Sequence, residues 1–179
     1  MFTVFNMSSE AVRMLEDPMA KNYWLMKCEA TAYTIDDLAR DGWTSWEGVR
    51  NYQARNFLRD KMQVGDGVLY YSSNADPSGV AGIAKITKSG HPDHFAWKKG
   101  HKYFDARSTK TFPIWYMVEI AFVERFAATV PLSTLKADKR LTRMLVIKKG
   151  SRLSVQPVRK IEFDIVVRHG RETLQRSRG

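Results

Sequence analysis

Cysteine is nearly absent from the sequence, since Cys28 is the single example among 179 residues. An internal disulfide and a zinc site built from several cysteines are therefore both excluded. Long apolar runs are missing too, because no stretch reaches the roughly 18 residues that a membrane-spanning helix needs. The first residues lack the basic start and apolar core of a secretory signal. These absences predict a soluble intracellular protein with no membrane partner: a cytoplasmic one, with association with the nucleoid, or a nuclear location in a eukaryote, as the alternatives.

Acidic residues are scarce relative to basic ones: 19 Asp and Glu stand against 29 Lys and Arg, giving a formal charge of +10 and a pI near 9.8. This balance favours a polyanionic partner, with nucleic acid ahead of an anionic membrane surface. Hydrophobic residues make up 44% of the chain and aromatic residues 12%, which excludes a wholly disordered protein. The length suits one domain, which we expect to be a monomer.

The two ends of the chain differ in charge from the middle. Residues 1–20 hold Arg13 against three acidic side chains, and residues 168–179 hold four Arg against one Glu. We therefore expect a flexible extension over 1–20, a folded domain over 21–167 and a basic disordered tail over 168–179. Residues 1–18 have two equally good explanations. They are either an extension upstream of a biological start at Met19 or a short native arm.

Apolar and β-branched patterning alternates with turn signals along residues 21–167. Strands are expected at 22–28, 68–72, 80–87 and 113–126, and helices at 34–42, 49–62, 131–139 and from Pro157 to about 167. Residues 143–149 fit a helix or a strand. Strands interleaved with short helices, without regular strand–helix–strand units, predict an α+β fold with a curled mixed sheet or small barrel.

Signatures of catalysis are missing. The sequence contains no Gly-x-x-x-x-Gly-Lys loop, no Gly-x-Gly-x-x-Gly turn and no Gly-x-Ser-x-Gly elbow. His91, His94 and His101 lie in a basic loop and are better explained as solvated side chains than as metal ligands. Cys28 is the last residue of an apolar stretch, and a cysteine in such a place is more often an inert core thiol than a nucleophile. We therefore predict binding rather than catalysis, with no catalytic residue, cofactor or metal.

Residues 43–56 are the richest candidate for a binding surface. The indole of Trp46 offers a plane on which a base can stack, and amide side chains offer both a donor and an acceptor to a base edge. Asn51 and Arg55 are four apart and share a helix face. The alternative is that Trp46 and Tyr52 are core residues while the polar side chains cap and solvate a helix.

Two further segments carry small polar side chains where a strand or helix begins or ends. Tyr71, Ser72 and Asn74 either form a second wall of donors or make an ordinary turn. Ser154 and Gln156 either close a pocket or form a helix N-cap segment.

Basic residues gather in two clusters outside these segments. Residues 85–110 hold seven Lys and Arg against two Asp, and residues 136–152 hold seven against one. These clusters either neutralise phosphates or form solvated faces. The candidate phosphate-binding residues are Lys98, Lys99, Lys102, Arg107, Lys110, Lys148, Lys149 and Arg152.

Six segments together resemble the EVE domain family, in the family's order and over nearly all of residues 21–167. They are Tyr23–Glu29, Thr34–Leu38, Trp46–Asn56, Tyr71–Asn74, Trp115–Val118 and Arg152–Val158. Trp46–Asn56 is the most specific of them. The sequence departs from the family pattern at Cys28, Ala30, Glu47 and Ser72, where Ser, Pro, Asp and His are usual.

The resemblance implies a PUA-like fold, a small curled mixed β-barrel flanked by short helices and related to ASCH and YTH domains. It implies a non-catalytic nucleic-acid-binding module that reads a modified base, such as 5-methylcytosine in DNA or a methylated adenine in RNA. Trp46 would be the aromatic wall, with Lys27 and Cys28 at the rim or floor. The other implied pocket residues are Asn51, Tyr52, Arg55, Asn56, Tyr71, Ser72, Asn74, Ser154 and Gln156. The alternative is an enzyme or small-molecule binder that acts on a modified nucleobase or nucleoside.

Overall fold

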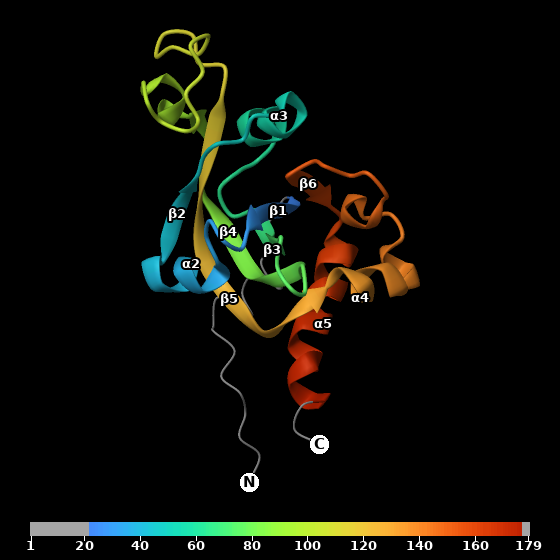
Figure 1. The fold of residues 1–179 in the computed structure, drawn as a ribbon. Helices are drawn as coiled ribbons and strands as arrows, with labels where there is room; N and C mark the ends of the chain where they lie inside the picture. The colour runs from blue at the N-terminus through green and yellow to red at the C-terminus, as the bar shows by residue number, and fades with distance from the viewer. Residues whose placement is uncertain (1–21, 177–179) are drawn as a thin grey trace.

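The computed structural model describes residues 22–176, so the extension expected over 1–20 lies outside the described residues. A six-stranded sheet forms the centre of the fold (Figure 1). Its strand order is β2 (Trp43–Trp46), β5 (Tyr116–Pro131), β4 (Gly79–Pro92), β3 (Gly67–Ser73), β1 (Tyr23–Glu29) and β6 (Val155–Val158). The pair β1–β3 is parallel and the other pairs are antiparallel.

Four α-helices flank this sheet in the described part of the chain: α2 (Ile35–Asp41), α3 (Tyr52–Asp60), α4 (Leu132–Ala137) and α5 (Lys160–Arg176). Short 3₁₀ turns occur at His94–Trp97, Lys139–Leu141 and Leu145–Ile147. No helix within residues 22–176 combines the length and the apolar character that crossing a membrane requires.

The long strands β4 and β5 curl the sheet. Their pairing carries four register shifts, and such irregularities bend strands and increase local twist. The short strands β2 and β6 are the two edges, so among residues 22–176 the sheet stays open and does not close into a barrel. The predicted α+β class with a curled mixed sheet and short helices is confirmed, while complete barrel closure is not found.

Side chains of the central strands alternate between two cores, one on each face of the sheet. Tyr23 and Leu25 of β1 join a core with residues of α4 and α5. Trp24 and Met26 join the other core, which includes residues of α2 and α3 as well as Trp46. The second core forms the floor on which the candidate site is built.

Side chains cap the starts of two helices, and the first of these begins where the sequence predicts. Thr34 caps α2 in a capping box, because its hydroxyl accepts from the Asp37 amide at 3.1 Å while the Asp37 carboxylate accepts from the Thr34 amide at 2.8 Å. Asn51 caps α3 through Oδ1, which accepts from the Ala54 amide at 3.0 Å. Gly42, with a φ of 79°, ends α2 as expected.

Three local predictions are wrong. Residues 43–46, where no strand was expected, form β2 and pair with β5. Pro157 lies in the edge strand β6, so α5 begins only at Lys160. This helix also continues beyond 167 to Arg176, so residues 168–176 are helical where a disordered tail was expected, and residues 177–179 lie outside the described residues. Gly170 of this helix packs closely against the Phe126 ring.

Candidate functional site

A cavity of about 490 Å³ opens where five segments meet, and we call it the central pocket. The end of β1, β2 with the loop after it, the start of α3, the loop around Tyr103 and the loop before β6 contribute to its walls. Its size falls within the range of small-ligand pockets, about 300–1,000 Å³. It is lined by Lys27, Cys28, Glu29, Ala32, Tyr33, Thr44, Ser45, Trp46, Glu47, Gly48, Val49, Arg50, Asn51, Lys102, Tyr103 and Ser154.

Trp46 belongs both to the core and to the wall of the central pocket. Its side chain is only 8% exposed, and its ring meets Tyr70 edge to face with ring centroids 5.7 Å apart. This geometry is the favourable one for aromatic pairs and fixes the plane of the indole. Trp46 is therefore a core residue, as the alternative interpretation held, and it also borders the cavity.

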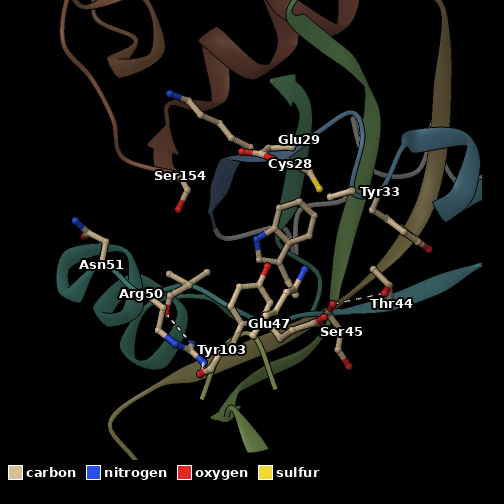
Figure 2. A pocket seen from close by; sticks show the side chains of 16 residues that line it. Cys28, Glu29, Tyr33, Thr44, Ser45, Glu47, Arg50, Asn51, Tyr103 and Ser154 are labelled. Carbon is tan, nitrogen blue, oxygen red and sulfur yellow. Dashed lines mark hydrogen bonds between the residues drawn. The ribbon is translucent and has the colours of Figure 1, made fainter. Parts of the chain in front are cut away.

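Tyr103 forms a second aromatic wall that the sequence did not predict. Its ring packs directly on Gly48, whose φ of 77° suits glycine. The Arg50 guanidinium lies 5.3 Å from the ring centroid, and the Lys102 ammonium lies 4.5 Å from it. Figure 2 shows Tyr103 and Arg50 on the side of the pocket opposite Cys28 and Ser154. Two cations against one ring make a preorganised wall.

The buried carboxylate of Asp93 holds this wall together. Asp93 is 0% exposed and accepts hydrogen bonds from the Gly48 amide at 3.1 Å, Arg50 Nη1 at 2.8 Å and the Phe95 amide at 3.0 Å. Arg50 also donates to the main-chain oxygen of Tyr103. The segment after β4 is thereby tied to the segment after β2. Because a buried carboxylate needs such hydrogen-bond partners, the contacts of Asp93 hold these two segments against each other.

The end of β1 supplies Lys27 and Cys28 at the other side of the central pocket. The Lys27 ammonium donates to the Ser151 oxygen at 3.2 Å, and burial lowers its pKa. Burial raises the pKa of the Cys28 thiol, which keeps it protonated and unlike an activated nucleophile. The Lys27 amide also donates to the Ser154 oxygen at 2.8 Å, which positions Ser154 at the rim.

Charged groups of both signs surround the cavity. Lys27, Arg50 and Lys102 supply positive charge, and Glu29 and Glu47 supply negative charge. A hydrogen bond with Tyr103 raises the pKa of Lys102, so its ammonium stays charged across the neutral range. Figure 2 shows hydroxyls of Ser154 and Ser45 among these groups. The pocket thus combines aromatic planes, hydrogen-bonding groups and cations, as recognition of a flat polar ligand requires.

Four predicted pocket residues lie outside the cavity lining. Tyr71 is buried in the core beneath α5, because side chains alternate along β3 and it is Tyr70 that faces Trp46. Ser72 is buried beside its strand partner Cys28. Asn74 adopts a φ of 52° in the turn after β3, as the alternative interpretation predicted. Gln156 donates to Ser151 and Leu153 and so stabilises the loop that carries Ser154.

The α3 residues predicted in the pocket point elsewhere too. Tyr52 is 51% exposed and stacks on Trp115 with ring centroids 5.0 Å apart. Arg55 donates to the Ile114 oxygen at 2.6 Å and to Asn56 at 2.8 Å. These three α3 residues share one outer surface because the helix turns away from the cavity after Asn51.

The predicted phosphate-binding residues differ in the contacts that their side chains make. Lys102 lines the central pocket, Arg107 is paired with Asp105 at 2.8 Å, and the Lys98 ammonium lies 4.7 Å from the Phe95 ring centroid. Lys148 donates to the Thr142 oxygen. Lys99, Lys110, Lys149 and Arg152 are exposed. Arg107 is the weakest candidate, because its charge is already neutralised.

The three histidines of the basic loop are not assembled as a metal site. His94 and His101 both pack against the Phe95 ring, with centroids 4.2 and 4.7 Å away, and His91 contacts the Ser89 oxygen. No group of three or more His, Cys, Asp or Glu side chains within the described chain could hold a metal ion.

Sequence reasoning missed several lining residues, above all Tyr103 and Arg50. Tyr103 belongs to the basic segment 85–110, whose most prominent feature is its Lys and Arg residues. Arg50 belongs to residues 43–56, where Trp46 and Asn51 are the stronger signals. A Tyr within a run of Lys and His was the available signal, since an aromatic ring among cations is typical of stacking sites.

Comparisons with known proteins agree with this architecture. The EVE domain model matches residues 22–169. Human thymocyte nuclear protein 1 is 36% identical over 164 residues, which is 82% of this chain and 72% of that protein. A protein from Pseudomonas putida has 42% identity and a TM-score of 0.80, covering 83% of this chain and 99% of that one. Human THYN1 in complex with 5-methylcytosine-containing DNA has 36% identity and a TM-score of 0.77, covering 83% and 97%. The chain belongs to the EVE domain family.

Proposed function

We propose that this protein binds nucleic acid and reads a modified base, which it holds in the central pocket. The observation that carries the proposal is one cavity bordered by the rings of Trp46 and Tyr103 and by the cations Lys27, Arg50 and Lys102. The crystal structure of human THYN1 with 5-methylcytosine-containing DNA supports the same ligand class.

The chemistry of the pocket suits a heterocycle attached to a phosphate. A base stacks on the Tyr103 ring, whose other side rests on Gly48, and it meets the exposed edge of Trp46. The hydroxyl of Ser154 and main-chain groups after β2 contact the edge of the base. Lys102, on the exposed side of the same loop, neutralises the adjoining phosphate.

Selectivity for the modification has two sources. Burying one methyl carbon contributes about 0.8 kcal/mol, which is about fourfold in affinity. Larger discrimination requires that the unmodified base leaves a polar group unpaired or a water trapped in the pocket. Extruding a base from a duplex costs a few kcal/mol, so single-stranded targets should bind more tightly than duplexes of the same sequence.

A binding titration tests this proposal directly. Short single-stranded oligonucleotides with one 5-methylcytosine, or with cytosine at that position, are titrated against the parent protein at fixed salt. We expect tighter binding of the methylated strand and a loss of about 5- to 100-fold in Tyr103→Ala. We expect Lys102→Ala to weaken both strands and to reduce the salt dependence by about one phosphate contact.

Matched variants separate the pocket from the general surface. Trp43→Ala removes an exposed ring from the other end of β2, and Lys136→Ala removes an exposed cation from α4. Both should bind as the parent does. Equal binding of methylated and unmethylated strands by the parent at every salt concentration contradicts the proposal, and so does unchanged affinity in Tyr103→Ala. Recovery of the nucleotide unaltered after incubation distinguishes a reader from an enzyme.

A further inference from the structure

We infer that the outer surface of α3 is a second nucleic-acid contact, at which the nucleotide next to the one in the central pocket stacks. We call it the aromatic platform, and it consists of Tyr52, Arg55, Trp115 and Phe112. Its ligand is a single strand, and the inference rests on the proposed function because it assumes that the pocket holds one nucleotide of that strand.

The platform is a ring held on a rigid support. Tyr52 is 51% exposed and stacks on Trp115 with an interplanar angle of 28°. Trp115 is only 3% exposed, and its Nε1 donates to Asp105 at 2.9 Å, which fixes the plane beneath Tyr52. Because Tyr52 is thus oriented before it binds, a base that stacks on it costs little conformational entropy.

The platform adjoins the central pocket. Tyr52 directly follows Asn51, which lines the cavity, so their Cα atoms are about 3.8 Å apart. On the inner side, the Arg50 guanidinium lies 5.2 Å from the Trp115 ring centroid and 5.3 Å from that of Tyr103. Two stacked rings, a guanidinium and a third ring therefore follow one another from the exposed Tyr52 to the pocket wall.

The charges around the platform favour nucleic acid over a protein partner. The Arg55 guanidinium lies 5.0 Å from the Tyr52 ring centroid and donates to the Ile114 oxygen. Phe112, two residues before Ile114, is 78% exposed and follows the exposed Lys110. A protein interface would offer a contiguous apolar patch, whereas rings interleaved with cations are typical of surfaces that bind single strands.

The geometry of Phe112 is also fixed in advance. Its amide donates to Thr109 Oγ1 at 3.0 Å, and its oxygen accepts from the Thr109 amide at 3.2 Å. This closed turn holds the main chain at Phe112, and its ring is 78% exposed. We assign it to a base farther along the strand than the base that stacks on Tyr52.

Ligands of graded length test the platform. The parent, Tyr52→Ala and Tyr52→Phe are titrated by NMR with 5-methyl-2′-deoxycytidine monophosphate and with a trinucleotide that carries 5-methylcytosine at its centre. We expect Tyr52→Ala to bind the mononucleotide as the parent does and the trinucleotide about 5- to 100-fold more weakly. Tyr52→Phe, which keeps the ring, should match the parent with both ligands.

The outcomes separate the platform from the pocket. Trp43→Ala serves as the matched control, because it removes an equally exposed ring on β2 and should affect neither ligand. If Tyr52→Ala weakens binding of the mononucleotide and of the trinucleotide equally, or changes the binding of neither, the platform is overturned. If the parent binds methylated and unmethylated ligands equally, while Tyr52→Ala still weakens binding of the longer ligand alone, the reader proposal fails and the platform stands.

Discussion

The ring of Tyr103 lies on Gly48 so closely that a Cβ at position 48 would overlap it. Gly48→Ala must therefore displace the ring and also places a side chain at a φ of 77°. We expect this variant to bind a 5-methylcytosine strand at least about fivefold more weakly, as Tyr103→Ala does. The positive φ should lower the free energy of unfolding by about 1–2 kcal/mol. Binding titration and urea denaturation measure the two effects.

Gly65→Ala is the control for Gly48→Ala. Gly65 also has a positive φ, of 93°, but a Cβ there meets no atom within 4 Å. This variant should lose a similar amount of stability and retain full affinity. If both variants lose affinity equally, strain of the backbone explains the loss and the contact between Gly48 and Tyr103 does not.

The ion pair between Asp93 and Arg50 should contribute strongly to stability. Asp93→Asn leaves the Arg50 guanidinium without its carboxylate in a largely buried position, which costs about 3 kcal/mol. For a chain of this length that corresponds to a fall in Tm of about 6–12 °C. Asp41→Asn, which breaks the exposed pair with Arg40, should lower stability far less, because solvent screens that pair. Similar losses in the two variants would refute a special role for Asp93.

Much of the fold could be predicted from local signals. The start of α2 at Thr34 was predicted because N-cap chemistry depends on a few adjacent residues, whereas Asn51, expected inside a helix over 49–62, is the N-cap of α3. The strands β2 and β6 were missed because both are four-residue edges whose pairing partners, β5 and β1, lie far away in the sequence. Tertiary pairing, rather than local propensity, determines such short strands.

The candidate site was predicted in part for the same reason. Trp46 and Ser154 were identified because their own segments carry the pattern, and Lys27 through the family resemblance; all three line the central pocket. Tyr71 was chosen over Tyr70 because residues adjacent in a strand face opposite sides, and the sequence does not reveal which side holds the cavity. Tyr103 was missed because only the fold brings its loop against Gly48.

The capping box of α2 should make stability depend on acid pH. Hydrogen bonds from Thr34 and Arg40 lower the pKa of Asp37 from 3.8 to about 2. A lowered pKa stabilises the folded state above pH 3.8, and this contribution is lost as the pH falls toward 2. Thr34→Ala should cost about 1 kcal/mol at neutral pH and somewhat less near pH 2, because the bond from its hydroxyl to the Asp37 carboxylate is lost there while the bond that it accepts from the Asp37 amide remains. Urea denaturation across this range measures it, with Thr31→Ala as the exposed control. A deficit that stays constant with pH contradicts the assignment.

Cys28, the one cysteine of the chain, should report on occupancy of the central pocket. Burial raises its pKa, so at pH 8 its thiolate fraction is below that of a free cysteine and iodoacetamide should react slowly. The rate should increase with pH beyond 9, and the protein unfolded in urea should react like a free thiol. A saturating 5-methylcytosine strand should slow alkylation of the folded protein by about tenfold or more, because ligand and reagent compete for the same space. Mass spectrometry measures the rate. A strand that binds without protecting Cys28 must occupy another surface, which would reject the central pocket as the base-binding site.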